Sequence, residues 1–382
     1  MVAGVLATYP ILLRYLETEQ IALIIGSAIA LGVLLSGRTR RIARGAVRAL
    51  GGMVGKLTAR EPAQDVAPGL VAIGPVRLLR RFTADATGFD VRVRGDAPLR
   101  ADALMRARFR ELNAIREARG LVPYYDAVRF LPVGLPEWSP DEQKLVIEAV
   151  PIDYAVAALV IDPAAADDAR RAGLELLHRV SGVQPYLRPH WAEGKMGLLG
   201  VQVCLVTADR RLLLRRRGDS VLFASGRWDV SVSGFAGSVD VVDGWHVDVT
   251  RTVEHETYRE IGHLRADPRT IRLLGVTHNW ATGAYDVLAC WVLEAETQDL
   301  LALLVRRRER GDRVFDTELR AIERYVWDTK NLIVNLDRHD VSAAWRECGI
   351  APADFEPQSL LCIDLTLDLL TAAKDPRFLP AM

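Results

Sequence analysis

The sequence predicts an α/β (α+β) chain in which a mixed β-sheet lies between helices. We expect a smaller α/β region and one N-terminal transmembrane helix to precede this sheet. Three observations carry the prediction: a charge-free apolar run at Ile21–Gly37, strand-like apolar patterns from residue 89 onward, and helix-period patterns between them. We therefore expect a membrane anchor at 1–50, a linker at 51–70, an accessory α/β region at 71–197 and a second α/β domain at 198–382.

The run Ile21–Gly37 predicts a single membrane span. Its seventeen residues would extend roughly 26 Å as a helix, which is close to the thickness of the hydrocarbon core. Glu17 and Glu19 precede the run, and arginines follow it at Arg38, Arg40, Arg41, Arg44 and Arg48. By the positive-inside rule we expect a single-pass protein of the cell membrane with the bulk of the chain cytoplasmic. The run is short enough for a buried core helix as well, but the one-sided arginines favour the span.

The composition argues against nucleic acid as a partner. Lys+Arg and Asp+Glu both total 49, so the formal net charge is zero and no basic field is present. Four cysteines, Cys204, Cys290, Cys348 and Cys362, lie far apart without a CxxC pair. We therefore expect reduced thiols rather than a zinc site or a cysteine nucleophile. No feature of the sequence predicts an oligomeric state.

The accessory region shows helix and strand patterns but no motif that names an activity. Its expected elements are a strand at Phe89–Val93, a helix at Ala101–Arg119, strands at Leu145–Val150 and Ala155–Ile161, and a helix at Asp167–Val180.

The pattern becomes sharper from Gly200 onward. We expect strands at Val201–Thr207, Leu212–Leu214, Ile271–Val276 and Tyr285–Leu293, and helices at Thr252–Ile261, Asp316–Tyr325, Val341–Glu347 and Leu360–Leu370. Gly262 follows the helix Thr252–Ile261 and has the position of a C′ glycine.

Two glutamates of this helix are candidates for chemistry. Glu256 and Glu260 are four residues apart, so they share one helix face at about 6 Å. Two carboxylates that face a pocket repel each other unless a cation lies between them, and oxygen ligands suit Mg²⁺ or Mn²⁺. An exposed acidic face is the competing interpretation, because Glu/Arg pairs such as Glu256 and Arg259 are common on solvated helices.

The arginines Arg215, Arg216 and Arg217 follow an apolar strand. Alternate side chains of a strand face opposite ways, so one or two of them could reach a pocket and bind phosphate oxygens. A solvated strand end is the alternative. Trp228 could stack on a base, but filling the core is favoured.

This succession resembles the Nudix hydrolase family over about Gly200–Leu370. The likeness rests on the strand pair with its arginines, the Trp-Asp-x-Ser-x-Ser-Gly run that ends at Gly234, and a helix that ends in Arg-Glu-x-Gly. The family box reads G-x5-E-x7-R-E-U-x-E-E-x-G-U, where U is aliphatic. The resemblance implies Mg²⁺-dependent hydrolysis of a nucleoside diphosphate-linked or related small molecule. It also makes Glu256 and Glu260 the catalytic metal ligands and Arg215–Arg217 the substrate-binding residues.

The sequence departs from the box at several positions. Arg259 replaces the first glutamate of the E-E pair, His255 replaces the arginine, and about seven extra residues separate Gly234 from His255. The upstream glutamate, which that arginine typically orients in the family, has no clear counterpart. Its acidic candidates are Asp240, Asp243 and Asp248. These departures leave a second hypothesis open: a catalytically reduced Nudix-like module that binds a ligand or a protein partner at the membrane.

Overall fold

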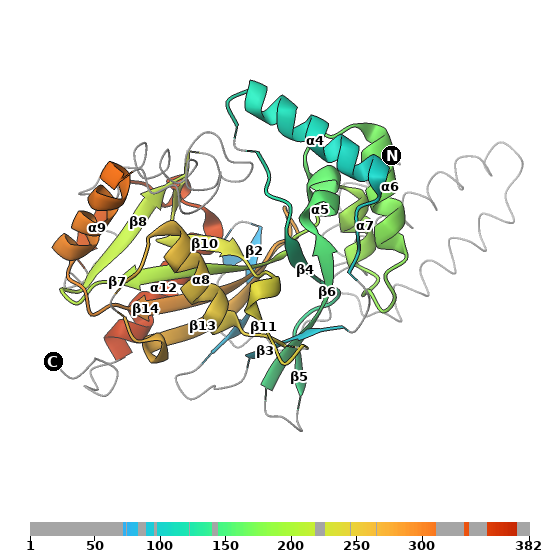
Figure 1. Ribbon diagram of the computed structural model, residues 1–382. Helices are drawn as coiled ribbons and strands as arrows, with labels where there is room; N and C mark the ends of the chain where they lie inside the picture. Colours follow the sequence, from blue (N-terminus) through green and yellow to red (C-terminus); the bar gives the residue numbers. More distant parts are fainter. Residues whose placement is uncertain are drawn as a thin grey trace, which may run out of the picture. The chain divides into compact units, whose positions relative to one another are not determined.

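The computed structural model describes residues 72–73, 75–82, 89–94, 98–121, 123–139, 144–217, 226–244, 246–264, 266–310, 332–335 and 350–372. They all lie in the compact unit Ala67–Met382 and form an α+β fold with two mixed sheets and seven described α-helices (Figure 1). The predicted anchor and linker and the predicted helices Asp316–Tyr325 and Val341–Glu347 lie outside these residues. Within the described part, no helix is long and apolar enough to span a membrane.

The larger sheet, sheet A, is the platform of the C-terminal half. Its strands run in the order β1 (Ala72–Ile73), β2 (Val76–Arg81), β13 (Ile271–Asn279), β14 (Tyr285–Val292), β7 (Leu199–Val206), β8 (Arg211–Arg216) and β15 (Leu332–Asn335). In addition, β10 (Val232–Phe235) pairs with β7, and β9 (Trp228–Asp229) pairs with β8. The pairing of β14 with β7 is parallel, whereas the other pairings are antiparallel.

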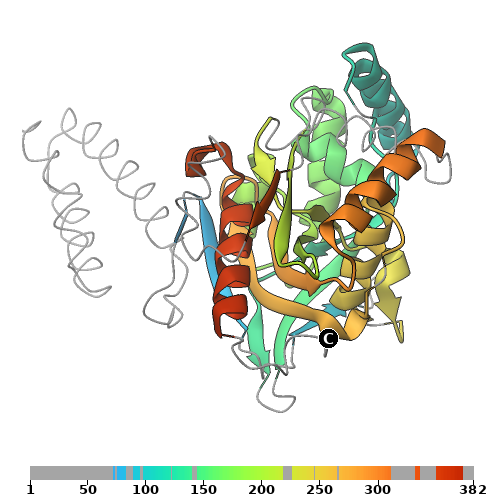
Figure 2. The same ribbon diagram turned by 90° about the vertical axis from the view of Figure 1, so that its left-hand side faces the viewer.

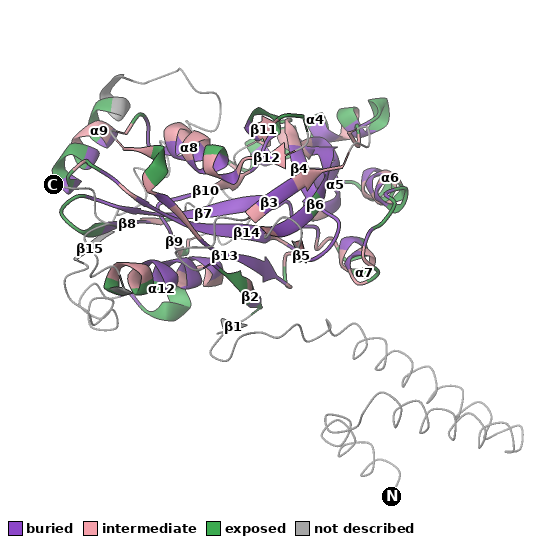
Figure 3. Ribbon diagram, turned by 90° about the horizontal axis from the view of Figure 1, so that it is seen from below, coloured by how far each residue is buried: buried purple, intermediate pink, exposed green. Residues whose placement is uncertain are grey.

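Helices cover both faces of sheet A. In Figure 3, α8 (Val249–Glu260) and α9 (Thr297–Arg310) lie on one side of the strands and α12 (Pro357–Ala372) lies on the other. Every residue of β7 is buried as a result. Val201 and Val203 belong to the core cluster that includes Val253 of α8, while Cys204 and Val206 pack with α12. Burial on both faces explains why β7 reads as a continuous apolar run.

The smaller sheet, sheet B, joins the accessory region to the C-terminal half. Its order is β11 (Val241–Val242), β12 (His246–Val247), β3 (Phe89–Val93), β6 (Lys144–Asp153) and β4 (Val128–Pro132), with β5 (Glu137–Ser139) on β6. The helices α4 (Ala103–Ala118), α5 (Tyr154–Ile161), α6 (Asp167–His178) and α7 (Leu187–Ala192) accompany it (Figure 1). Because β2 joins sheet A and the hairpin β11–β12 joins sheet B, the expected boundary at residue 197 does not separate the two sheets.

Most predicted elements occur where the patterns placed them. Phe89–Val93 is β3, α4 lies within Ala101–Arg119, and α12 contains Leu360–Leu370. Gly262 has a φ of 112°, as a C′ glycine requires.

The predicted strand Ala155–Ile161 was wrong, because these residues form α5. Asp153 stands at the N-cap, and the residues from Ala155 to Val160 are all buried. A short apolar run that is buried on every side has no polar face from which its period can be read. Its alanines then favour the helix.

The first turn of α12 is held to sheet A by a buried polar network. Gln358 donates to Asp286 Oδ2 at 2.5 Å and accepts from Asn279 Nδ2 at 3.0 Å. Burial, with Glu356 and Asp229 nearby, raises the pKa of Asp286 to about 7. Figure 2 shows α12 beside the sheet. The helix therefore docks onto a carboxyl group that the fold prefers to keep protonated.

Asp286→Asn should remove a pH dependence of stability. Because the folded-state pKa of Asp286 is raised, its stabilisation is fully present below about pH 4 and is lost as the pH rises towards 7. The asparagine imitates the protonated acid. We expect a free energy of unfolding close to wild type near pH 4.5 and roughly 1–3 kcal/mol higher at pH 8. Chemical denaturation of the full chain measures this. Asp243→Asn, in an exposed turn, is the control. If Asp286→Asn differs from wild type in its free energy of unfolding by the same amount at both pH values, the raised pKa of Asp286 is contradicted.

Candidate functional site

The helix α8 presents its two glutamates to the core rather than to solvent. Asp248 caps it by accepting from the backbone N–H groups of Thr250 (2.9 Å) and Arg251 (3.3 Å). Glu256 and Glu260 are both buried on the face that also carries Val249 and Val253. The exposed acidic face considered from the sequence is therefore not what the structure shows.

Glu256 lies against the glycine that ends the Trp-Asp-x-Ser-x-Ser-Gly run. Its side chain is fully buried, and a Cβ atom at Gly234 would collide with its carboxylate. Arg259 Nη2 forms an ion pair with Glu256 Oε2 at 2.5 Å. The absence of a side chain at Gly234 thus lets the helix carboxylate approach β10, and Arg259 balances its charge.

Glu260 is bound by the first arginine of the triplet. Arg215 Nη1 lies 2.5 Å from Glu260 Oε2, and Arg215 Nη2 donates to Ser233 Oγ at 2.5 Å. The backbone N–H of Ser233 also donates to Glu260 Oε2, at 3.3 Å. Burial raises the pKa of Glu260 even though Arg215 and Arg259 act in the opposite direction. The helix, β8 and β10 therefore meet at one ion-pair cluster.

Asp229 completes the cluster from β9. Its Oδ2 accepts from Arg217 Nη1 at 2.6 Å and from Arg215 Nη2 at 3.4 Å. Its Oδ1 accepts from the hydroxyl of Ser359, on α12, at 2.5 Å. Burial alone would raise the pKa of Asp229, but Arg217, Arg215 and Ser359 hold it below its ordinary value. This carboxylate is therefore charged and orients both arginines.

Arg216 does not join the cluster. It is exposed, and its Nε donates to the backbone carbonyl of Gly226 at 2.8 Å. Strand alternation explains the separation, because Arg215 pairs with Asp229 while Arg216 pairs with Trp228. Trp228 in turn packs its ring 6.5 Å from that of Phe355, in keeping with a packing role.

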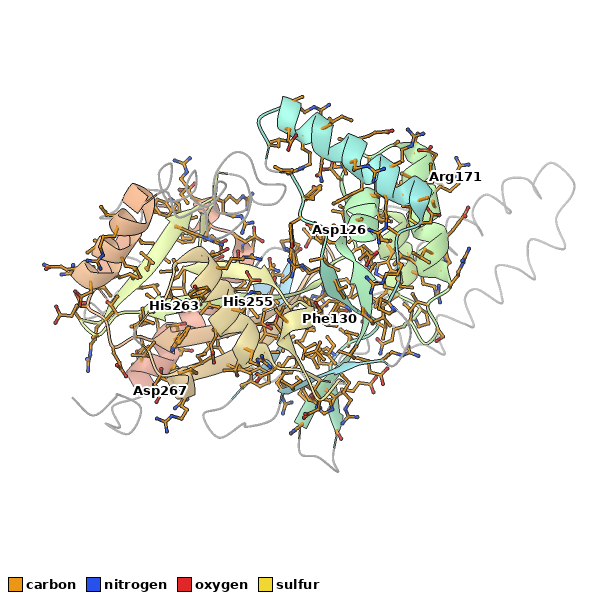
Figure 4. The ribbon with its side chains drawn as sticks, in the orientation of Figure 1. Asp126, Phe130, Arg171, His255, His263 and Asp267 are labelled. Carbon is orange, nitrogen blue, oxygen red and sulfur yellow. The ribbon has the colours of Figure 1, made fainter. Side chains whose placement is uncertain are left out.

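The structure distinguishes the three acidic candidates for the upstream box position. Asp240 is buried, accepts from the Gly237 N–H at 2.8 Å and lies 3.7 Å from Nδ1 of His255. Asp248 is the helix cap, and Asp243 occupies an exposed turn with a φ of 53°. Asp240 is thus the acid that faces α8 at His255, which Figure 4 labels.

Sequence reasoning missed Asp229, Ser233 and the particular role of Asp240. The first two stand in the Trp228–Gly234 motif, and Asp240 follows Gly234 after five residues, as the G-x5-E spacing of the box asks. The extra residues come after Asp240, where they form the hairpin β11–β12. Counting forward from Gly234 rather than backward from His255 would have found Asp240.

The donor set does not make a magnesium cage as it stands. Glu256 and Glu260 each bind an arginine, and the described residues contain no group of three or more His, Cys, Asp or Glu side chains placed to hold a metal ion. Mg²⁺ prefers six oxygen ligands and few competing cations. The chemistry that the geometry offers is recognition of anionic oxygens by guanidinium groups.

No model of a known protein family matches the chain, and no curated protein matches its sequence.

Gly234→Ala should destabilise the fold by about 1–3 kcal/mol, because the added methyl group collides with the Glu256 carboxylate. The same substitution should cost less in a Glu256→Ala background, where the collision is absent. Denaturant unfolding of the wild type, both single variants and the double variant gives the coupling free energy. Strictly additive effects would show that Gly234 and Glu256 do not contact each other.

Proposed function

We propose that this protein binds a diphosphate-containing ligand, of the nucleoside diphosphate-linked class, at the ion-pair cluster between α8, β8 and β9–β10. The observation that carries the proposal is the convergence of three guanidinium groups from two elements. Arg215 and Arg217 come from β8 and its end and share Asp229. Arg259 comes from α8, where it pairs with Glu256 and acts electrostatically on Glu260 together with Arg215. Guanidinium groups bind phosphate oxygens in a bidentate geometry. Carboxylates already orient the three arginine side chains, so little side-chain entropy is lost when a ligand binds.

The net charge of the cluster determines whether a diphosphate needs an additional positive charge in order to bind. Arg215, Arg217 and Arg259 carry three positive charges, while Asp229, Glu256 and Glu260 carry up to three negative ones. A diphosphate added to a neutral cluster leaves excess negative charge in a partly buried site, which is unfavourable. Binding therefore needs a further positive charge, proton uptake by Glu260, whose pKa is raised, or a cation that arrives with the ligand.

Magnesium-dependent hydrolysis of such a diphosphate is the second candidate function. It is favoured by the position of Glu256 and Glu260 on one buried helix face beside Gly234. That reaction would need Glu256 as a metal ligand, but Glu256 forms a direct ion pair with Arg259. For this reason we rank binding above hydrolysis.

The sequence supports a place for this activity at the cytoplasmic face of the cell membrane. The apolar run Ile21–Gly37 with arginines on its C-terminal side favours a single-pass anchor and a cytoplasmic C-terminal half. The ligand is then a small cytoplasmic molecule.

Inorganic pyrophosphate should raise the thermal unfolding midpoint of the full chain, because a ligand that binds only the folded state stabilises it. Arg215→Met should remove this shift. Arg216→Met is the matched control, since its guanidinium lies outside the cluster, and it should retain the shift. Scanning fluorimetry measures the pyrophosphate-induced shift of each variant, once with EDTA and once with Mg²⁺. Loss of the shift in both variants, or in neither, would count against the cluster as the binding site.

Phosphate release separates the two candidate functions. The wild type and Glu260→Gln are incubated with a panel of nucleoside diphosphate derivatives and Mg²⁺ or Mn²⁺. Binding without turnover is the expected result. Metal-dependent release that disappears in Glu260→Gln would instead establish the hydrolase and place its metal on α8.

A further inference from the structure

We infer that Arg129 of β4 is an anion-binding residue through which the accessory region contributes to the same ligand site. The inference rests on the proposed function, because it takes the anion to be a phosphoryl group of the diphosphate ligand. It adds a residue that lies about 90 positions before the cluster in the chain.

Arg129 is a buried cation that has no carboxylate partner in the described part of the chain. Only 7% of the residue is exposed. Its Nη1 donates to the backbone carbonyl of Phe235 at a long 3.3 Å, and its buried Nε has no hydrogen-bond partner. Among the described residues, no Asp or Glu oxygen lies within ion-pairing distance of this guanidinium. A buried charge is unfavourable unless an opposite charge or several hydrogen bonds compensate it.

Arg116 of α4 shows what a compensated arginine looks like in this fold. It is similarly buried, with 3% of the residue exposed, and its Nη1 lies 3.0 Å from Asp162 Oδ2. Its guanidinium also stacks over the ring of Tyr124 at 3.9 Å. Unlike Arg116, Arg129 has no carboxylate partner among the described residues, so we take a bound anion to be its partner.

The position of Arg129 points to the ligand as that partner. Arg129 forms a backbone bridge to Gly237, where a Cβ atom would lie 2.8 Å from Arg129 Nη1. Gly237 follows Gly234, which contacts Glu256, after at most about 10 Å of extended chain. Arg129 thus contacts the C-terminal end of β10, the strand whose Ser233 and Gly234 contact the glutamates of α8.

Arg129 supplies the positive charge that the cluster lacks for a diphosphate. The three arginines of the cluster face three carboxylates, whereas no described Asp or Glu oxygen lies within ion-pairing distance of Arg129. A phosphoryl oxygen at its guanidinium would make a charge-assisted hydrogen bond in a site with little competing water.

The test compares the full chain with Arg129→Met, Arg129→Lys and Arg116→Met. Thermal unfolding is followed by scanning fluorimetry without ligand and in a titration with inorganic pyrophosphate. Without ligand, Arg129→Met should keep or raise the unfolding midpoint, because it removes an uncompensated charge. Arg116→Met should lower the midpoint, since it leaves the buried Asp162 without its cation. With pyrophosphate, Arg129→Met should bind at least tenfold more weakly, and Arg129→Lys should recover part of the loss.

Each remaining outcome contradicts the proposed function, the inference about Arg129, or both. If Arg129→Met lowers the midpoint as much as Arg116→Met, or binds pyrophosphate as tightly as the wild type, Arg129 is structural and the inference fails. If Arg215→Met abolishes binding while Arg129→Met retains it, the proposed function stands without the inference. If only Arg129→Met abolishes binding, pyrophosphate binds at Arg129 and not at the cluster, so the proposed function and the shared site of the inference both fail. Absence of any pyrophosphate effect on the wild type would overturn both.

Discussion

The architecture of the candidate site depends on the buried carboxylate of Asp229. One of its oxygens accepts from Ser359 of α12, and the other accepts from Arg217 and Arg215. The same group therefore binds a helix on one face of sheet A and two arginines, of which Arg215 reaches Glu260 of α8 on the other face. A fully buried aspartate is tolerated only because these donors compensate its charge, so the helix and the arginines depend on each other. Loss of Asp229 would leave Arg217 without its carboxylate partner and Arg215 paired with Glu260 alone.

The second constraint is the interleaving of the two sheets. The extra residues of the box loop form the hairpin β11–β12, whose β12 pairs with β3 through His246 and Val247. The next residue, Asp248, caps α8. Sheet B is thus connected directly to the start of the helix that carries Glu256 and Glu260. This connection gives the accessory region a physical role in the site, because it holds α8 at its N-terminus and brings Arg129 to the loop after β10.

The sequence predicted the elements that have a clear period or a clear stop. The helix that became α8, its C′ glycine and the strands β7, β13 and β14 were read from patterns of these kinds. It also brought Arg215, Arg216, Arg217, Glu256 and Glu260 into one candidate site. In the structure Arg215, Arg217 and Glu260 are linked through Asp229 in one ion-pair network, Glu256 pairs with Arg259, and Arg216 lies outside. The helix α5 was misread because a run buried on all sides has no polar face. The role of Asp229 could not be read from the sequence, because it depends on α12, which lies 130 residues away in the chain. The Nudix resemblance and the membrane span stay predictions.

The central claim is that a diphosphate group binds between β9–β10 and α8. Hydrogen–deuterium exchange of the full chain, with ADP and with adenosine as the uncharged control, tests it most directly, because exchange reports where a ligand reduces backbone opening. Our account predicts that ADP, and not adenosine, slows exchange in residues 228–235 and in α8, Val249–Glu260. Equal protection by both ligands, or protection that spares α8 and β10, would contradict it.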